Sequence, residues 1–578
     1  MGKILITRDA DKSKMMQKFF SEFKQNSFIE FENSFITTYS KLRINTENTY
    51  VDNDAFIAGV GTYIYKSEIG KTALKLILED FTSVEDIQAK INGSFCILLR
   101  VKNKIFIFVD QMASYNIYYY SQQNDFIITN TYFHIAKVLA KKNINNFGLI
   151  ETWLQRSISG ITPFSDIFKL MGTNYIEYDN KSFSIRDIKG NKEKRNEAVK
   201  LNDLLENLSR SLPNAVKDCG VFMTGGQDSR LVLAVLLAAN CNPYLYYGIG
   251  NSFDTCTKAA DDMIVKKIAS RFGLKTQNMN WQDSDDSDKS NYLCKYGELY
   301  MLYYMNKNIF SEFEEKISNK FLFFGYFGEI YRNIESITQY KSNLFSLSDF
   351  LDDIYLDNHK NIFSNRSYSL YKEEIYKEFE TVCFSKGIDK HHITKQEFQK
   401  LNTEYRKMWD ITMNNFANQF CYSFPLFANA DLVEYTEKIP FVDKNNSKLI
   451  MKIIEYFHSD LLTIPFFSHI KYKRFNKVTL ELKEGSVCGE IKDYIKKYVK
   501  NTFIRKYIRI AYYKLMNDKK GELELANENK LKNKYFKEFA KTRIFNYVDC
   551  SNFNHENIDI RTLKRGILID YLINKARE

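Results

Sequence analysis

The 578-residue sequence has few of the residues that mark fibrous, disordered or disulfide-rich proteins. Proline occurs 6 times and glycine 23 times, too rarely for a collagen-like chain or a Pro/Gly-rich disordered one. The 9 cysteines are odd in number and include no CxxC pair, so neither a disulfide framework nor a zinc knuckle is indicated. We therefore expect buried free thiols in a reducing, cytoplasmic environment.

Long apolar runs and long basic runs are also missing. The longest apolar run, LVLAVLLAA, ends at Ala239 and is shorter than the roughly 20 residues that a membrane span needs. The opening segment MGKILITRDADK has no hydrophobic stretch of the signal-peptide kind. Lys and Arg exceed Asp and Glu by 82 to 71, yet no run of five basic residues occurs. We expect no membrane span and no nucleic-acid partner.

Residues 1–195 contain pairs of alternating apolar and polar segments that are joined by polar turns. Three such pairs are SFCILLRV with IFIFVD, NIYYY with FIITN, and NYIEY with FSIRDI. Consecutive hairpins predict antiparallel sheets, and KTALKLILEDF adds one amphipathic helix. The charged stretch KGNKEKRNEA, Lys189 to Ala198, predicts a linker.

Beyond the linker, buried strands alternate with helices. The predicted strands are Gly220–Met223, Tyr244–Ile249 and Phe321–Phe324, and the helices between them are Ser229–Asn240 and Asp254–Phe272, the latter ended by Gly273. This alternation predicts a parallel sheet with helices on both faces. From about residue 340 onward we expect helices. The predicted domains are residues 1–195, residues 200–480 and a basic helical extension, 481–578.

The sharpest motif, TGGQDSR, lies between the first of these strands and the following helix. Gly225 and Gly226 permit a tight turn, and Thr224 and Ser229 add hydroxyl donors in front of a helix N-terminus. This arrangement suits pyrophosphate, and Asp228 is then explained if it holds Mg²⁺ against the phosphates. The alternative is an ordinary strand-to-helix turn in which Asp228 caps the helix.

This motif resembles the SGGxDS pyrophosphate loop of the class B asparagine synthetase family. FGYFGEIYR, Phe324 to Arg332, is similar to the second loop of that family. Further similar segments are SFPLFANADLVEYTEKIP and IPFFSHIKYKRF, and the hairpin from Ser94 resembles the core of the family's glutaminase domain. The resemblance implies an α+β Ntn-hydrolase-like domain of antiparallel sheets, then an α/β PP-loop domain and a helical extension.

The resemblance also implies the cofactors ATP and Mg²⁺ and a set of site residues. Asp228 and Glu329 are the implied metal ligands, and the implied nucleotide-binding residues are Thr224, Gly225, Gly226, Asp228, Ser229, Gly248 and Gly325. Lys473, with Lys471 in reserve, is the implied cation for the oxyanion of the transition state. A solvated role remains the alternative for these lysines.

Tyr326 is the implied catalytic base. It stands where β-lactam synthetase and carbapenam synthetase have a Tyr whose Glu partner helps it to deprotonate an amine. Glu373 and Glu374 lie in the right general region for that partner, but neither aligns. The alternative for Tyr326 is an aromatic ring that only fills the loop.

The departures from the family concern the nitrogen source. Family glutaminases use a cysteine directly after the initiator Met, whereas this chain has Gly2 there and no cysteine before Cys96. We therefore expect a degenerate glutaminase domain. The expected partner is a small molecule or peptide with a carboxylate and an amine, and an oligomer is possible.

The expected activity is an ATP-dependent, AMP-forming ligase or cyclase that makes an amide bond. Two alternatives remain: an ammonia-dependent synthetase of the asparagine synthetase type, and a non-catalytic scaffold that kept the fold. His391 and His392 are expected to be a pair on a surface helix, without a metal, because neighbours on a helix do not share a face.

Overall fold

The computed structural model describes the chain with several gaps. It does not describe residues 1, 32, 53–54, 123–124, 140–141, 155–159, 180–181, 189–200, 213, 250–254, 281–294, 300–308, 333–343, 357–362, 364, 410–411, 468–469, 476, 483–529, 548–557 and 559. It gives the backbone alone at 214–215, 255–259, 309–310, 353–354, 365, 408–409, 412, 470–475, 477–482, 547 and 561.

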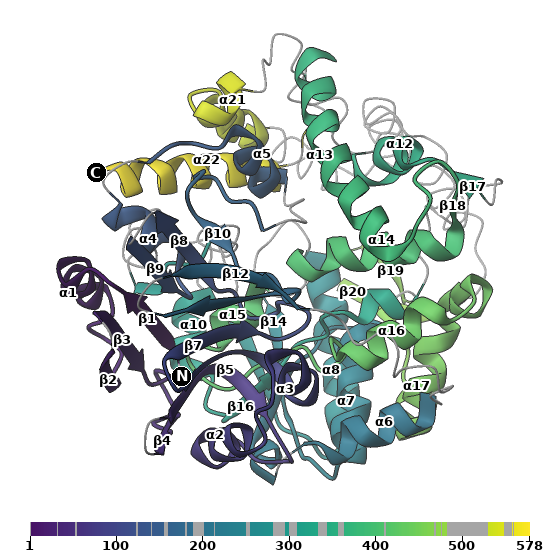
Figure 1. The fold of residues 1–578 in the computed structure, drawn as a ribbon. Coiled ribbons are helices and arrows are strands. Elements are labelled where there is room, and N and C mark those ends of the chain that lie inside the picture. The colour runs from purple at the N-terminus through teal and green to yellow at the C-terminus, as the bar shows by residue number, and fades with distance from the viewer. Residues whose placement is uncertain are drawn as a thin grey trace.

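The N-terminal part consists of two antiparallel sheets with helices (Figure 1). Its strands are β1 (Lys3–Thr7), β2 (Gln25–Phe31), β3 (Ser34–Tyr39), β4 (Thr49–Asp52), β5 (Ala55–Ile64), β6 (Asn92–Val101), β7 (Lys104–Val109), β8 (Tyr118–Gln122), β9 (Asp125–Thr129), β10 (Phe168–Lys169), β11 (Asn174–Tyr178) and β12 (Phe183–Asp187). Its helices are α1 (Ala10–Phe19), α2 (Gly70–Glu79), α3 (Val84–Lys90), α4 (Tyr132–Val138) and α5 (Asn146–Leu154).

The two sheets pack face to face. One has the order β10-β8-β9-β1-β3-β2 and the other β12-β11-β7-β6-β5-β4, with antiparallel neighbours throughout. Alternate side chains such as Ile6 and Val60 fill the space between the sheets. Helices α2 and α3 cover one outer face, and α1 and α4 cover the other. The three predicted hairpins are confirmed as β6–β7, β8–β9 and β11–β12, and these layers are consistent with the expected Ntn-like domain.

A parallel sheet forms the second part, as predicted. Its strands have the order β15-β14-β13-β16, and they are β13 (Cys219–Phe222), β14 (Tyr244–Ile249), β15 (Thr276–Asn280) and β16 (Phe321–Phe323). The elements around it are α6 (Leu201–Arg210), η2 (Asn214–Lys217), α7 (Gln227–Ala238), α8 (Thr255–Phe272), α10 (Ile309–Lys316), η5 (Gly328–Tyr331), α15 (Thr412–Ala417), η8 (Phe441–Ser447), α17 (Lys448–His458) and η9 (Ser459–Thr463).

Helices cover both faces of this parallel sheet. Val221 and Leu245 point toward α7, α8 and α17, whereas their neighbours Phe222 and Tyr246 pack toward α10 and α15. Both faces are buried at β13, β14 and β16, because these strands carry apolar residues at consecutive positions. Gly273 ends α8 with a φ of +65°, a left-handed conformation that favours glycine, so the predicted helix end is confirmed.

The rest of the described chain is mainly helical, with two exceptions to the prediction. Its elements are β17 (Leu344–Phe345), α12 (Leu347–Phe350), η6 (Leu351–Tyr355), α13 (Asn365–Lys386), β18 (Ile393–Thr394), α14 (Lys395–Trp409), α16 (Ala430–Lys438), β19 (Ile470–Phe475), β20 (Lys477–Leu482), α21 (Arg543–Tyr547) and α22 (Ile560–Arg577). The exceptions are the short pair β17–β18, in which Phe345 lies opposite Ile393, and the β19–β20 hairpin, in which Tyr472 lies opposite Leu480. Alternation of apolar and polar residues explains the hairpin, because that period suits a strand.

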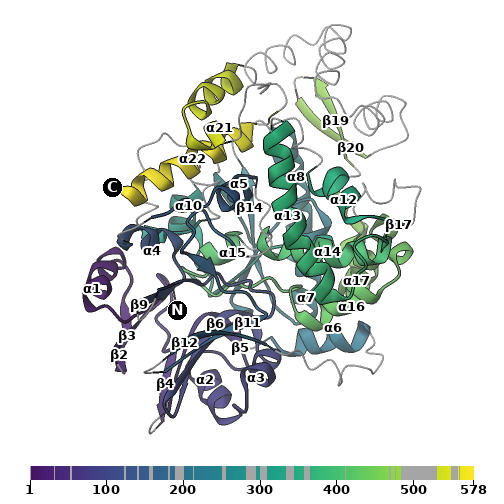
Figure 2. The same cartoon turned by 45° about the horizontal axis from the view of Figure 1, so that its top comes forward.

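The last helix returns to the first domain. Figure 2 shows α22 beside α21 and α5, and the Trp153 indole of α5 donates a 2.9 Å hydrogen bond to the Thr562 carbonyl of α22. The predicted linker lies outside the described residues, as does most of the predicted basic extension. The domain boundaries therefore stay predictions.

The two sheet systems meet through a buried polar interface. The Lys3 ammonium donates a 2.8 Å hydrogen bond to the Tyr296 carbonyl, and the Lys41 ammonium donates a 2.6 Å bond to the Asn418 carbonyl. Both lysines are fully buried, and burial lowers the pKa of each to about 7. Burial likewise raises the pKa of Glu298, beside Lys3, to about 7. The interface therefore contains three buried ionisable groups whose pKa values lie near 7.

The described cysteines lie in the core, and the histidine pair lies on the surface. Within the described residues, Cys96, Cys219, Cys241, Cys383 and Cys421 are buried free thiols, as predicted. His391 and His392 are exposed as predicted, but they lie in a turn and not in a helix, since the Asp389 carboxylate accepts the His391 backbone N–H and binds the His392 ring.

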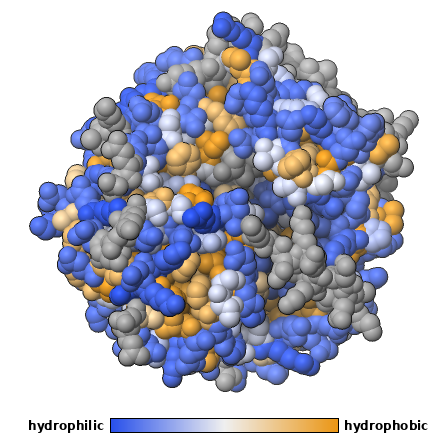
Figure 3. All heavy atoms as spheres, in the orientation of Figure 1, coloured by the Kyte–Doolittle hydropathy of each residue, from blue (hydrophilic) through white to orange (hydrophobic). Residues whose placement is uncertain are grey.

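On the face of the molecule drawn in Figure 3, hydrophilic residues lie between the hydrophobic ones. Among the described helices, none combines the length and the apolar composition of a membrane span.

Candidate functional site

The TGGQDSR segment forms a loop whose N–H groups are largely used within the protein. The Ser229 hydroxyl accepts the Thr224 N–H at 3.1 Å, and the Thr224 hydroxyl accepts the Gly226 N–H at 3.2 Å. The Gly225 N–H donates a 2.6 Å hydrogen bond to the carboxylate of Asp261, a buried residue of α8. The loop is therefore held in a defined shape before any ligand arrives.

Helix α7 begins two residues earlier than predicted. Gly226 adopts an extended conformation and is the N-cap, without a side-chain capping bond, so Asp228 lies in the first turn of the helix. The side chain of Asp228 is thus not the cap that one interpretation of the motif required. It projects from the first turn of a twelve-residue helix, where the partial positive charge of the helix favours an anion.

A second loop, between β16 and η5, packs directly on the first. A Cβ atom at Gly325 would lie 2.6 Å from the Ser229 nitrogen, and one at Gly328 would lie 2.4 Å from the Asp228 carboxylate. Phe327 between them has a φ of +65°, which turns the chain sharply. Glycine at both positions is what lets the second loop bring Glu329 beside Asp228.

Two arginines accompany the two carboxylates. The Arg332 guanidinium lies 3.2 Å from the Asp228 carboxylate and 3.8 Å from that of Glu329, and Arg406 of α14 lies 3.9 Å from Glu329. Burial, and then the charge of Glu329, raises the pKa of Asp228 to about 6, although Arg332 opposes the rise. The two acids are thus close enough to repel each other and need nearby positive charge.

The arrangement of the acids fits a divalent cation. Oδ1 of Asp228 is buried and has no hydrogen-bond partner among the described residues, which is costly for a carboxylate. No group of three or more His, Cys, Asp or Glu side chains that could hold a metal occurs in the described part of the chain. A Mg²⁺ ion at Asp228 and Glu329 would therefore complete its oxygen ligands with water or phosphate, as is usual for this ion.

Arg230 ties a third segment to the first loop. This arginine is fully buried and donates to the carbonyls of Leu461, Ile464 and Pro465 at 3.1, 2.5 and 2.8 Å. Its guanidinium also lies 3.8 Å from the centre of the Phe466 ring.

The same segment leads into the strand that carries the predicted lysines. The Phe467 N–H donates a 2.7 Å hydrogen bond to the Gly225 carbonyl of the first loop. The chain is therefore bound to this loop three residues before β19 begins at Ile470. Lys471 and Lys473 belong to β19, opposite Glu481 and Thr479, but their side chains lie outside the described residues.

Tyr326 is half-buried at the tip of the second loop. Its ring stacks on Phe324, with ring centres 5.2 Å apart, and packs against the apolar groups of both faces of the parallel sheet. Glu373 and Glu374 lie on α13 with side chains 65% and 53% exposed, and both bind Lys377. Such solvated, lysine-bound carboxylates are poorly suited to act as the partner of a base.

Gly248 is buried near the end of β14, where it lies opposite Met279 in β15. Asp261, Arg332 and Arg406 were missed from the sequence. Asp261 could have been found, since it is an acid on the apolar face of α8, three residues before the buried Ile264. Arg332 ends the second motif, whereas nothing local marks Arg406.

The position where the resemblance places a glutaminase nucleophile is closed. Gly2 is buried, its N–H donates to the Tyr39 carbonyl at 3.0 Å, and its carbonyl accepts from Asn130 at 2.9 Å. A Cβ atom at Gly2 would lie 2.9 Å from the Ser40 carbonyl and 3.1 Å from the Phe23 ring. A side chain at this position has no space.

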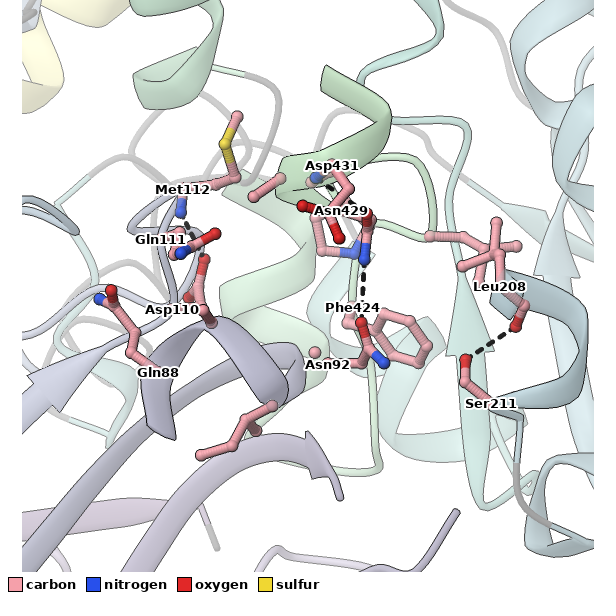
Figure 4. A pocket seen from close by; sticks show the side chains of 17 residues that line it. Gln88, Asn92, Asp110, Gln111, Met112, Leu208, Ser211, Phe424, Asn429 and Asp431 are labelled. Carbon is pink, nitrogen blue, oxygen red and sulfur yellow. Dashed lines mark hydrogen bonds between the residues drawn. The ribbon is translucent and has the colours of Figure 1, made fainter. Parts of the chain in front are cut away.

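A hollow of about 550 Å³, including its open mouth, lies between the two parts of the protein (Figure 4). Several of its polar side chains are already bound within the protein. Asn429 donates to Asn92 at 2.9 Å, and Asp110 accepts N–H groups of Met112, Ser114 and Tyr115 at 2.9 to 3.2 Å. It contains none of the residues of the two loops.

No family model matches the sequence, and no curated protein matches it. One similar solved structure is glutamine phosphoribosylpyrophosphate amidotransferase from B. subtilis complexed with ADP and GMP, at 6% identity over 48% of this chain and 65% of that chain, with a TM-score of 0.24. Another is the allosteric regulatory enzyme of purine biosynthesis, at 5% identity over the same shares, with a TM-score of 0.23. The match thus spans less than two thirds of either protein, and TM-scores this low support no further conclusion.

Proposed function

We propose that the chain is an ATP- and Mg²⁺-dependent ligase that adenylates a carboxylate and transfers the acyl group to an amine. One observation carries this proposal: two glycine-containing loops bring Asp228 and Glu329 together at the N-terminus of α7, and a buried oxygen of Asp228 has no partner in the part of the chain that the structure describes. A plain structural turn needs neither the second acid nor the two arginines around it.

The proposed reaction has two balanced steps. A carboxylate oxygen of the substrate attacks the α-phosphorus of ATP, and the bond to the β-phosphate oxygen breaks, so that pyrophosphate leaves with the electron pair. An amine nitrogen then attacks the acyl carbon, the bond to AMP breaks, and the nitrogen loses one proton to a base. Bound Mg²⁺ would supply positive charge to the phosphates.

The described residues would mainly position the substrates and neutralise the negative charge of the phosphates. Asp228 and Glu329 hold the cation, and the Thr224–Ser229 loop cradles the pyrophosphate at the start of α7. Tyr326 is proposed as the proton acceptor, because its hydroxyl-bearing ring stands on the same loop as Glu329. Lys473 is proposed to stabilise the oxyanion, since β19 follows directly on the segment bound to Gly225.

The amine is proposed to come from a small-molecule or peptide substrate and not from glutamine. The packing at Gly2 supports this, because the place of a glutaminase nucleophile is filled by Phe23 and Ser40. A non-catalytic scaffold is the second candidate. It is favoured by the acids and arginines being mutually paired, and by the Gly225 N–H being taken by Asp261.

ATP–pyrophosphate exchange tests the proposal. The purified chain, MgCl₂ and ATP are combined with pools of amino acids, peptides and sugar acids, and exchange is expected with one pool. Asp228→Ala should abolish the exchange because Ala cannot hold the cation, whereas Asp203→Ala, an exposed acid on α6, should leave it unchanged.

Three other results would change the proposal. Exchange that persists in Asp228→Ala would refute the proposed cation site at Asp228. Amide formed only when ammonium is added would favour an ammonia-dependent synthetase. No exchange with any pool would favour the scaffold.

A further inference from the structure

Arg332 occupies an unusual place among the charges of the site. It is the residue that ends η5, three positions after Glu329, and its backbone is extended there. Its guanidinium lies 3.2 Å from Oδ2 of Asp228 and 3.8 Å from Oε1 of Glu329. One side chain therefore reaches both proposed metal ligands.

The pairing with Arg332 decides how Asp228 is turned. Because Oδ2 faces the guanidinium, Oδ1 is directed against Gly328 and is buried without a hydrogen-bond partner in the described residues. A cation that takes Oδ1 of Asp228 and an oxygen of Glu329 would share both carboxylates with the guanidinium, which already holds Oδ2 of Asp228 and lies beside Oε1 of Glu329. Arg332 and a divalent cation thus compete for the same negative charge.

Arg332 also retains hydrogen-bonding capacity for a second partner. A guanidinium has five N–H donors, and its Nε is buried and unpaired among the described residues. The side chain is 37% exposed, so part of it faces outward. A planar fork that loses its carboxylates beside a phosphate-binding loop is well suited to phosphate oxygens.

We propose that Arg332 is a built-in counter-ion: it pairs with Asp228 and Glu329 while no divalent cation is bound, and with nucleotide phosphate oxygens once one is. This inference rests on the proposed function and assigns Arg332 a positioning role within it. Its consequence is that one residue weakens binding of the metal alone and strengthens binding of the metal–nucleotide complex. Metal binding and nucleotide binding thereby become coupled.

Calorimetric titration of wild-type protein and Arg332→Met, first with MgCl₂ alone and then with ATP in saturating MgCl₂, tests the proposal. We expect Arg332→Met to bind Mg²⁺ alone roughly tenfold more tightly, because no guanidinium then competes for the two carboxylates. It should bind ATP roughly tenfold more weakly, because the phosphates lose a charged hydrogen-bond donor. Arg271→Met is the matched control, because Arg271 pairs with Asp460 on the surface of α8 at 3.1 Å. It should change neither affinity.

Arg332→Gln and Arg332→Lys keep the test decisive if the Met variant unfolds. Gln should behave like Met, whereas Lys keeps the charge and should retain the weak binding of Mg²⁺ alone. Both affinities falling together, or both staying at the wild-type value, would overturn the inference while leaving the proposed function in place. A wild-type chain that binds neither Mg²⁺ nor ATP would overturn both.

Discussion

Two of the glycines that allow close packing, Gly2 and Gly328, differ in what packs against them. At Gly2, before β1, the neighbours are an aromatic ring and a backbone carbonyl, and the glycine's own N–H and carbonyl are both bonded. At Gly328, the first residue of η5, the neighbour is the Asp228 carboxylate, one buried oxygen of which has no hydrogen-bond partner among the described residues. The first place is satisfied by the protein itself, and the second still has charge for a ligand to neutralise.

This contrast shows how the two domains of one chain can differ in chemical capacity. The N-terminal sheets are tightly packed, and backbone groups at their interface with the parallel-sheet part are bound, since the Asn116 N–H donates to the Asn415 side chain, which donates to the Ser114 carbonyl. The parallel sheet instead ends in loops where like charges face each other. We therefore expect ligands to act on the second region and packing changes to act on the first.

After the loss of exchange in Asp228→Ala, the next largest effect is expected at Tyr326. Tyr326→Phe removes the phenolic oxygen and keeps the ring that stacks on Phe324, so the loop should survive. If that oxygen, in its ionised form, accepts the proton of the amine, amide formation should fall by roughly 10²- to 10⁴-fold while pyrophosphate exchange persists. Separate assays of exchange and of amide product measure this split.

Tyr456→Phe, an exposed tyrosine on α17, is the control and should change neither step. If both steps of Tyr326→Phe stay at the wild-type rate, Tyr326 only packs. If both fall together, it shapes the nucleotide site instead of acting as the base.

A smaller effect is expected at the closed end of β1. Gly2→Ala should lower the free energy of unfolding by about 1–3 kcal/mol, because the added methyl group overpacks a filled space. Chemical denaturation measures the change, and the loss should be smaller when Phe23→Ala is present, because the ring is one of the close neighbours. A neutral Gly2→Ala would show that the space is not closed.

The same position tests the glutaminase interpretation. Gly2→Cys introduces a thiol, but the closed packing should prevent glutamine from reaching it. Glutamate released from glutamine by this variant, or by the wild-type chain, would contradict the contrast between the two regions.

An effect of similar size concerns pH and the buried Glu298. Its pKa is about 7 in the folded protein, above its unfolded value, so the folded state binds more protons between pH 4.5 and 7. The stabilisation is present below pH 4.5 and is lost as the pH rises through 7. Glu298→Gln should remove this loss of about 1–3 kcal/mol. Denaturation at pH 5 and pH 8 measures it.

Lys3, Lys41, Lys169 and Lys444 act in the opposite direction over a higher range, because the lowered pKa of each, about 7, makes the folded state bind fewer protons between pH 7 and 10.5. The Glu298 effect is therefore read from the difference between wild-type protein and Glu298→Gln at the same pH. Glu373→Gln, an exposed glutamate on α13, should not alter the pH dependence. An unchanged slope in Glu298→Gln would show that the carboxyl is not held protonated.

Local features of the chain could be predicted because they are encoded within a few neighbouring residues. The alternation in SFCILLRV and IFIFVD sufficed for the β6–β7 hairpin, and a glycine after an apolar helix sufficed for the end of α8 at Gly273. The strand β15 was missed, since TQNMN has little apolar character and becomes a strand only beside β14.

The sequence by itself therefore determined three hairpins, three of the four parallel strands and the position of the TGGQDSR turn, because periodicity and glycine placement act over short distances. Only the tertiary structure decided which charges meet. Asp261 reaches Gly225 from another helix, Arg332 reaches Asp228 from another loop, and Gly2 is closed by Phe23. Such contacts depend on how sheets and helices pack, and no local pattern specifies that geometry.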